Sequence, residues 1–183
     1  MKIAIKTAIK TVSPAVLAML MIMPVSQASA MDVTAGSQLM VKTSVVEVIG
    51  VREIEAGKFA HGIRKSKAAL AKNSAISLRK PLLDNLCAAN LAISNMEQAN
   101  QYCNDAVNTG KASVISYNNR AVMHYVMGNF EASLEDLDEA SNHGRFQNMV
   151  ADNFKIVNKQ NLLSNSYSLL TDENASFIAT SNR

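Results

Sequence analysis

Residues 118–140 read NNRAVMHYVMGNFEASLEDLDEA, which we interpret as two helices joined by a turn at Gly128-Asn129. A Gly-Asn pair is typical of a tight turn, because glycine readily adopts the left-handed conformations that such turns use. Working outward, we expect the first helix at Ser116 to Met127 and the second at Phe130 to Asn142. His143-Gly144 follows as a C-terminal stop signal. This stretch therefore predicts a helical hairpin.

The pattern occurs again 34 residues earlier, at residues 84–106, which read DNLCAANLAISNMEQANQYCNDA. Residues that coincide under this shift are Asn85 and Asn119, Leu91 and Tyr125, Asn95 and Asn129, and Ala106 and Ala140. We expect helices at Leu82 to Ser94 and at Glu97 to Asn108 in this copy. A weaker third copy aligns Gly57-Lys58-Phe59 with Gly128-Asn129-Phe130. Repetition at a fixed period indicates stacked units of similar structure, and here an all-α fold.

These residues resemble the tetratricopeptide repeat, a helix-turn-helix of about 34 residues with small residues where its helices touch. The motifs that carry the resemblance are Asn118-Asn119-Arg120-Ala121, Gly128-Asn129-Phe130 and Ala140, with Asn85, Cys87, Ala99 and Ala106 in the earlier copy. The resemblance implies a helical-hairpin solenoid of about three repeats, at residues 43–76, 80–113 and 114–147. The sequence departs from the family in lacking its closing proline, and Ser133 and Gly62 replace a common alanine.

The segments outside the repeats complete the predicted domain plan. Stacked hairpins share one core, so the end of the stack needs a cap. Residues 148–161 are the predicted capping helix, or equally the first helix of a fourth repeat. The repeat domain then spans residues 43–163, after an N-terminal linker at 31–42 and before a loosely ordered, flexible tail at 164–183.

The first thirty residues predict a secretory signal peptide. Three lysines precede an uncharged apolar run at Val12 to Met23, and Ala28-Ser29-Ala30 gives a small-x-small cleavage motif. Cleavage after Ala30 is expected, with cleavage after Ala28 as an alternative. A retained membrane anchor is the other interpretation, although an apolar core of about 12 residues is short for a bilayer. We therefore expect a soluble, periplasmic protein without stable membrane insertion.

Cys87 and Cys103 are the only cysteines in the chain. An even number of cysteines in an oxidising compartment predicts a disulfide. Both residues fall on the helix faces that meet inside the middle hairpin, and a clasp there would stabilise the array by roughly 3 kcal/mol. Unpaired thiols, or a redox or metal pair, are the alternatives.

Composition and charge narrow the functional classes. Beyond residue 30 the chain carries 15 basic and 15 acidic residues, a balance that does not suit nucleic-acid binding. The basic stretch at residues 58–80 and the acidic stretch at residues 131–139 are solvated helix faces, or a dipolar surface suited to self-association. His61, His124 and His143 belong to no catalytic or metal-binding motif, so neither an enzyme nor a cofactor is expected.

The resemblance to the tetratricopeptide family implies a concave groove, lined by the first helices, that holds an extended or helical peptide. Transferred to this sequence, the groove residues are Asp84, Asn85, Ala88, Leu91, Asn118, Asn119, Val122 and Tyr125, with Glu47, Val51 and Ile54 in the first unit. Asn85 and Asn119 are the strongest candidates, because a side-chain amide both donates to and accepts from a peptide backbone. Basic residues of the kind that grip a C-terminal carboxylate are missing from this set.

The sequence therefore predicts a non-catalytic protein-interaction module that acts as a periplasmic adaptor for a protein or peptide partner. A thiol-redox or other enzyme using Cys87 and Cys103 is one alternative. A self-assembling structural module is the other.

Overall fold

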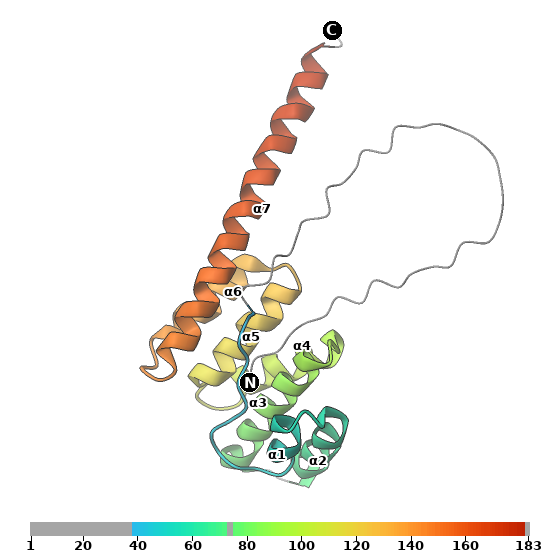
Figure 1. Ribbon diagram of the computed structural model, residues 1–183, viewed down its shortest axis with the longest axis vertical. Coiled ribbons are helices and arrows are strands. Elements are labelled where there is room, and N and C mark those ends of the chain that lie inside the picture. The colour runs from blue at the N-terminus through green and yellow to red at the C-terminus, as the bar shows by residue number, and fades with distance from the viewer. Residues whose placement is uncertain (1–37, 73–74, 182–183) are drawn as a thin grey trace, which may run out of the picture. The chain divides into compact units, whose positions relative to one another are not determined.

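The computed structural model describes residues 38–72 and 75–181, with side chains described as far as Tyr167. Its secondary structure is helical (Figure 1), which confirms the predicted all-α class. The helices of the described residues are α1 (Val51–Glu55), α2 (Phe59–Lys72), α3 (Ile76–Ala92), α4 (Met96–Asn108), α5 (Val114–Val126), α6 (Phe130–Ser141) and α7 (Gln147–Ser181). The predicted signal peptide lies outside the described residues.

Two helical hairpins, α3–α4 and α5–α6, form the centre of the fold. Their turns have the same backbone geometry, because Ser94 adopts a left-handed φ of 57° and Gly128, 34 residues later, a φ of 82°. Local side chains fix where two of these helices begin. Asn95 caps α4 by accepting from the backbone of Gln98, and a Ser113–Ser116 capping box starts α5.

Small residues line the contacts inside the hairpins. Ala106 and Ala140, equivalent under the 34-residue shift, are both fully buried, which lets each pair of helices approach closely. At Ser133 the resemblance to the tetratricopeptide repeat leads one to expect alanine. The Ser133 hydroxyl donates to the buried Ala121 carbonyl at 2.7 Å. This substitution is therefore accommodated by a hydrogen bond between α5 and α6.

The first predicted unit, 43–76, differs from the other two. Its first helix, α1, has only five residues, and Glu47 precedes it. Gly50, which the alignment of the third copy places opposite Ala121 of α5, lies outside the helix at the N-cap of α1 with a φ of 95°. A Cβ added at Gly62 would lie 2.5 Å from Ile54 Cγ1, so glycine is required where α2 crosses α1. Val51 and Ile54 are buried at this contact.

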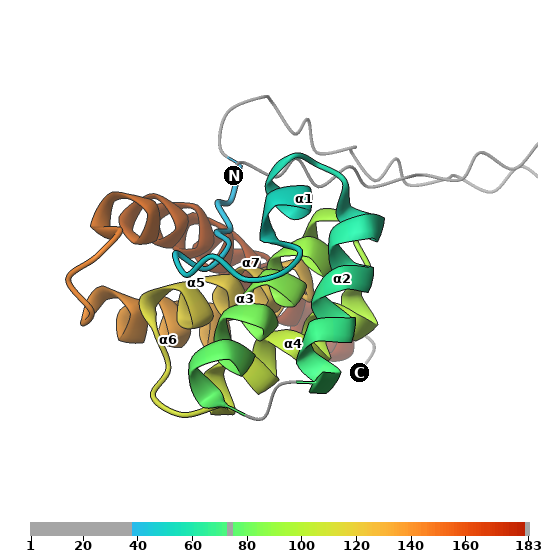
Figure 2. The same cartoon turned by 90° about the horizontal axis from the view of Figure 1, so that it is seen from below.

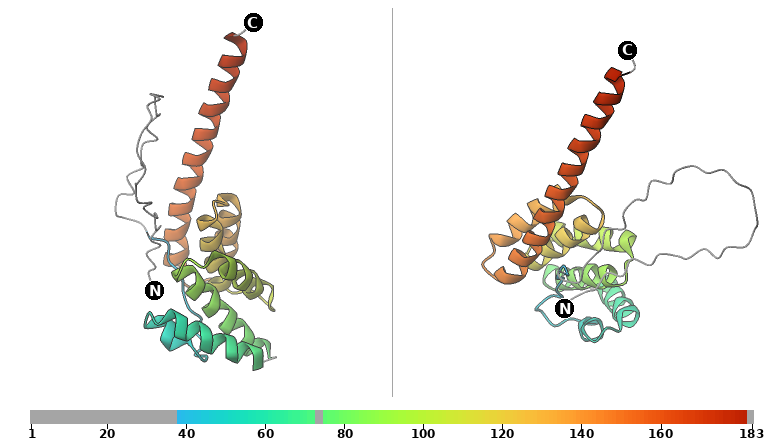
Figure 3. Two further views of the ribbon diagram at one scale, coloured as in Figure 1. Left: turned by 90° about the vertical axis from the view of Figure 1, so that its right-hand side faces the viewer. Right: turned by 45° about the horizontal axis from the view of Figure 1, so that its top comes forward.

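The C-terminal region contains the predicted capping helix at 148–161 within a longer helix, which extends into the residues 164–183 that were expected to form a tail. The chain forms one helix, α7, from Gln147 to Ser181 (Figure 3). Residues 147–181 contain neither glycine nor proline, so nothing in the sequence forces the helix to end. Its first turns pack on the rest of the fold, where Val150, Asn153 and Val157 are buried. None of the helices in the described part of the chain combines the length and apolar character of a membrane span.

Candidate peptide-binding face

Residues 38–44 form an extended segment that packs across the helices and is not a free linker. Figure 2 shows it running over α5 and α3 towards α1. The side chains of Leu39, Val41 and Thr43 are buried, whereas those of the residues between them are partly exposed. This alternation is that of a β-strand, whose successive side chains point to opposite sides. Part of the predicted linker at 31–42 is therefore a docked strand.

Four asparagine side chains hold the backbone of this segment, and we call them the asparagine ladder: Asn85 from α3, Asn118 and Asn119 from α5, and Asn153 from α7. Asn119 contacts both polar groups of the Lys42 backbone. Its Oδ1 accepts from the Lys42 amide at 3.0 Å, and its Nδ2 donates to the Lys42 carbonyl at 2.8 Å. A side-chain amide here takes the place that a neighbouring strand has in a sheet.

Met40 is held from two helices at once. Asn153 Oδ1 accepts from the Met40 amide at 2.8 Å, and its Nδ2 donates to the Met40 carbonyl at 2.8 Å. Asn118 Nδ2 donates to the same carbonyl at 2.9 Å, and Asn118 Oδ1 accepts from Asn153 Nδ2 at 2.8 Å. The two asparagines therefore support each other as well as the segment, and both are fully buried.

The ladder is less complete at Ser44. Asn85 Oδ1 accepts from the Ser44 amide at 2.7 Å, but the Asn85 Nδ2 group is buried without a hydrogen-bond partner. The chain bends immediately after this point, because the Ser44 hydroxyl accepts from the Val46 amide at 3.2 Å. Val45 and Val46 are exposed as a result.

Three members of the ladder, Asn85, Asn118 and Asn119, belong to the predicted groove, and the fourth, Asn153, does not. Asn85, Asn118 and Asn119 are brought together on one face, as expected for residues of the first helices. Asn153 was overlooked, although the 34-residue shift that relates Asn85 to Asn119 leads directly to it. Asn85, Asn119 and Asn153 bind Ser44, Lys42 and Met40 respectively. A shift of 34 residues among these asparagines thus corresponds to two residues along the bound strand.

The other predicted groove residues have packing roles. Ala88, Leu91 and Val122 are buried in the same hydrophobic cluster as Leu39 and Val41. Tyr125 is partly buried and packs on the Phe130 ring, with the ring centroids 5.5 Å apart. In the first unit, Glu47 is exposed and forms an ion pair with Arg52. These side chains shape the core beneath the segment, while the ladder makes the polar contacts.

Asp84, beside Asn85 on α3, is buried, and its Oδ1 atom has no hydrogen-bond partner. Burial raises the pKa of this carboxyl to about 7, against the opposing influence of the Ser116 hydroxyl and the Lys80 ammonium. Asp84 lines a cavity of about 450 Å³ at the point where the segment bends. Ser44, Val46, Ser113 and Phe146 are among the other lining residues.

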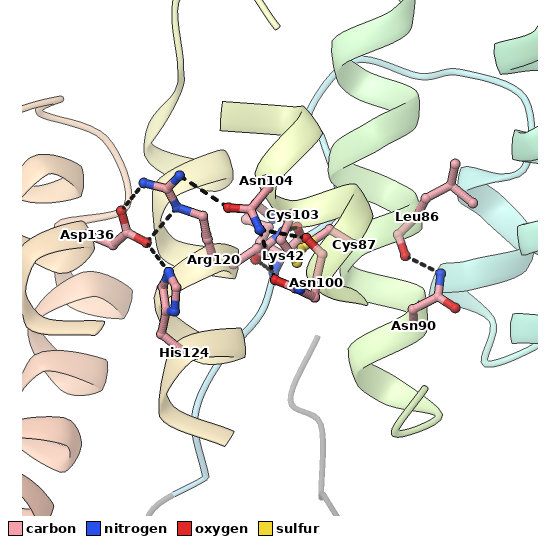
Figure 4. The surroundings of a disulfide bond; sticks show 11 residues. Lys42, Leu86, Cys87, Asn90, Asn100, Cys103, Asn104, Arg120, His124 and Asp136 are labelled. Atoms are coloured by element: carbon pink, nitrogen blue, oxygen red, sulfur yellow. Dashed lines mark hydrogen bonds and ion pairs between the residues drawn. A yellow bond between two sulfur atoms is a disulfide. The ribbon is translucent and has the colours of Figure 1, made fainter. Parts of the chain in front are cut away.

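Behind the ladder, Cys87 of α3 and Cys103 of α4 form the predicted disulfide (Figure 4), with their Cα atoms 4.8 Å apart. Both residues are fully buried. The bond therefore fixes α3, which carries Asn85, to its partner helix.

An ion pair ties α5 to α6 in the same region. Arg120 donates to both carboxylate oxygens of Asp136, at 2.8 and 2.6 Å, and Asp136 is almost fully buried. His124 lies 3.7 Å from the same carboxylate, and burial lowers the pKa of its imidazole despite this neighbour. Figure 4 shows Arg120 and His124 converging on Asp136. This group positions α5, from which two ladder residues project.

Among the residues that the structure describes, no set of three histidine, cysteine or acidic side chains is arranged to hold a metal ion. Compared with protein-family models, with curated proteins and with solved structures, the chain matches none.

Proposed function

We propose that this protein is a non-catalytic binding module that holds a protein partner in extended conformation against the asparagine ladder. The observation that carries the proposal is the set of six hydrogen bonds between ladder amides and the backbone of Met40, Lys42 and Ser44. The face can bind an extended chain, because it does so with the chain's own segment.

The chemistry of the ladder favours recognition of a main chain over recognition of a particular sequence. Every peptide group other than one at proline offers an N–H and a C=O, and a carboxamide matches both. Each such hydrogen bond contributes about 0.5–1.5 kcal/mol net, so several in register give useful affinity. Selectivity would come from the buried positions now filled by Leu39, Val41 and Thr43.

The finer architecture belongs to the same proposal. A tetratricopeptide-like solenoid of about three hairpins accounts for the 34-residue spacing of Asn85, Asn119 and Asn153, since equivalent positions of stacked units face the same side. The lysine-rich, apolar N-terminus and Ala28-Ser29-Ala30 support export to the periplasm after signal cleavage. The disulfide is consistent with such an oxidising compartment. In that setting the protein would serve as an adaptor or scaffold.

The test uses a chain in which the bound segment is released. Val41→Asp places a carboxylate where a side chain only 1% exposed now packs, and leaves every ladder residue in place. A fluorescent peptide with the sequence QLMVKTS, copied from residues 38–44, is titrated into this variant and followed by fluorescence anisotropy. We expect saturable binding.

Matched asparagine variants locate the binding site. In the Val41→Asp background, Asn119→Ala with Asn153→Ala should weaken peptide binding at least tenfold. Asn100→Ala with Asn148→Ala, which removes two exposed amides of α4 and α7, should leave it unchanged. Equal affinity in both double variants would show that the peptide binds elsewhere and would refute the proposal.

A further inference from the structure

The asparagine ladder holds its own chain incompletely, and the defect lies at one end. Asn119 and Asn153 each use both the oxygen and the nitrogen of the side-chain amide on the segment. Asn85 uses only its oxygen, and its buried nitrogen has no acceptor. The Lys42 carbonyl accepts from Asn119 Nδ2. In a strand that continued straight, the carbonyl at the position of Ser44 would accept from Asn85 Nδ2 in the same way.

The bend of the chain after Ser44 explains this missing contact. The Ser44 hydroxyl turns the following backbone by accepting from the Val46 amide, and Val45 and Val46 are 55% and 46% exposed. The segment thus leaves the ladder before its last position is satisfied. The chain then continues to α1, which begins at Val51.

A second buried polar atom without a partner belongs to the neighbouring residue in the chain. Asp84 Oδ1, a buried acceptor without a donor, belongs to the residue preceding Asn85 and lines the 450 Å³ cavity at the bend. A buried donor and a buried acceptor without partners are uncommon in native proteins. A polypeptide that continued straight past Ser44 would enter this region with one free C=O and one free N–H per peptide group, the two complementary groups.

We propose that residues 38–44 are a displaceable placeholder, and that the partner is a longer extended polypeptide that continues past the position of Ser44 into this cavity. Its β-branched or aliphatic side chains would occupy the alternate positions of Leu39, Val41 and Thr43. The inference rests on the proposed function. It adds that the free protein is inhibited by its own N-terminal segment, and that the partner binds residues which that segment leaves unsatisfied.

The competition between the two strands sets the expected affinities. The segment is tethered to the face that it covers, so its effective concentration is on the order of millimolar. A peptide that only copies the segment gains no contact over it and competes poorly. A longer peptide gains partners for Asn85 Nδ2 and Asp84 Oδ1, and should displace the segment more readily.

Two acetylated and amidated peptides test this directly against the full chain. The short one is QLMVKTS, and the long one carries three further strand-forming residues, Thr-Val-Thr, at its C-terminus. Each is titrated into the unaltered protein, into Val41→Asp, and into Ile49→Asp, which adds the same charge to an exposed site outside the ladder and the cavity. Asn85→Ala in the Val41→Asp background completes the set.

We expect Val41→Asp to bind both peptides at least tenfold more tightly than the unaltered protein or Ile49→Asp. The long peptide should bind about tenfold more tightly than the short one, and Asn85→Ala should reduce that ratio towards one. Equal affinities of the three proteins would overturn the placeholder while leaving the peptide-binding face intact. Equal affinities of the two peptides would overturn the role of the cavity. Absence of binding in every protein would overturn the proposed function itself.

Hydrogen exchange on the unaltered protein gives a second measurement, which does not depend on whether any variant folds. The amides of Met40, Lys42 and Ser44 donate to the ladder and should exchange slowly in the free protein. Saturation with the long peptide should speed their exchange at least tenfold, because the segment is displaced. Bound peptide with unchanged protection of these amides would contradict the placeholder.

Discussion

Asn118 and Asn153 meet at the Met40 carbonyl, to which both donate, and they are hydrogen-bonded to each other at 2.8 Å. One residue comes from α5 and the other from α7, so the segment joins two helices that have few other contacts. The extended strand is in this sense part of the core as well as an occupant of its surface.

Removing one ladder residue should destabilise the fold. Asn153→Ala leaves the buried polar groups of Met40 and Asn118 short of partners, and we expect a loss of about 1–3 kcal/mol in the free energy of unfolding. Urea denaturation followed by circular dichroism measures it. Asn148→Ala, an exposed site on the same helix, serves as the control and should change stability little. Similar values for both variants would mean that the ladder contributes nothing to stability.

The Arg120–Asp136 pair should show strong coupling. Arg120→Met leaves an almost fully buried carboxylate without its cation, and we expect destabilisation of about 2–4 kcal/mol. Arg120→Met combined with Asp136→Leu removes both charges and should recover most of that loss. A double-mutant cycle measured by thermal or urea denaturation tests this prediction. Additive losses in the double variant would contradict it.

Asp84 should make stability depend on pH. Its pKa is about 7 in the folded protein against an ordinary value of 3.8. At a pH between these two values, the carboxyl therefore binds a proton in the folded state that it does not bind in the unfolded state. Stability therefore falls as the pH rises from about 4 to 7 and levels off above, by at most about 4 kcal/mol. Lys80, Lys111, His143 and Arg145 line the same cavity, and the Lys80 charge opposes the shift.

Asp84→Asn removes this titration and keeps the shape of the side chain. We expect the variant to be more stable than the unaltered protein at pH 8 and similar to it near pH 4, in parallel denaturation series. His143→Gln, a substitution of another residue that lines the same cavity, serves as the control. Curves for Asp84→Asn and the unaltered protein that run parallel across this range would show that the carboxyl is not the cause.

The disulfide should stabilise the middle hairpin without chemical turnover. Closing a loop of sequence separation 16 contributes about 3 kcal/mol in the chain-entropy model, so Cys87→Ala with Cys103→Ala should lose roughly that amount. Because both residues are fully buried, an added reductant should cleave the disulfide, and an alkylating reagent should modify the resulting thiols, only after unfolding. Mass spectrometry after reduction and alkylation in native and in denaturing buffer measures this. Rapid modification of the native, reduced protein would favour the redox alternative.

The central hairpins could be predicted because each depends on residues close together in the chain and because their pattern occurs twice. The turns at Ser94 and Gly128 and the four central helices follow from residues within one hairpin, and the structure places those helices within a few residues of the predicted ends except at the start of α3. The length of α7 is not evident from the sequence, because many serine and asparagine residues are typical of a loosely ordered tail, although no glycine or proline interrupts residues 147–181.

The sequence indicates the helix residues of the candidate site but not the strand that they hold. Asn85, Asn118 and Asn119 follow from the repeat, whereas the strand that they hold has no signal of its own: residues 38–44 are short, lie outside the repeats and read as linker. Their docking depends on contacts 41 to 113 residues away, which no local pattern encodes.

The span between Met40 and Asn153 also orders the folding of the chain. The hairpins α3–α4 and α5–α6 close through near neighbours and can form early, whereas the strand must wait until α7 has joined α6. The contact between Met40 and Asn153 joins residues 113 positions apart, so we expect the strand to dock after the hairpins have formed. Until then the N-terminal strand is exposed, and any chain able to pair with it has its best opportunity during that interval.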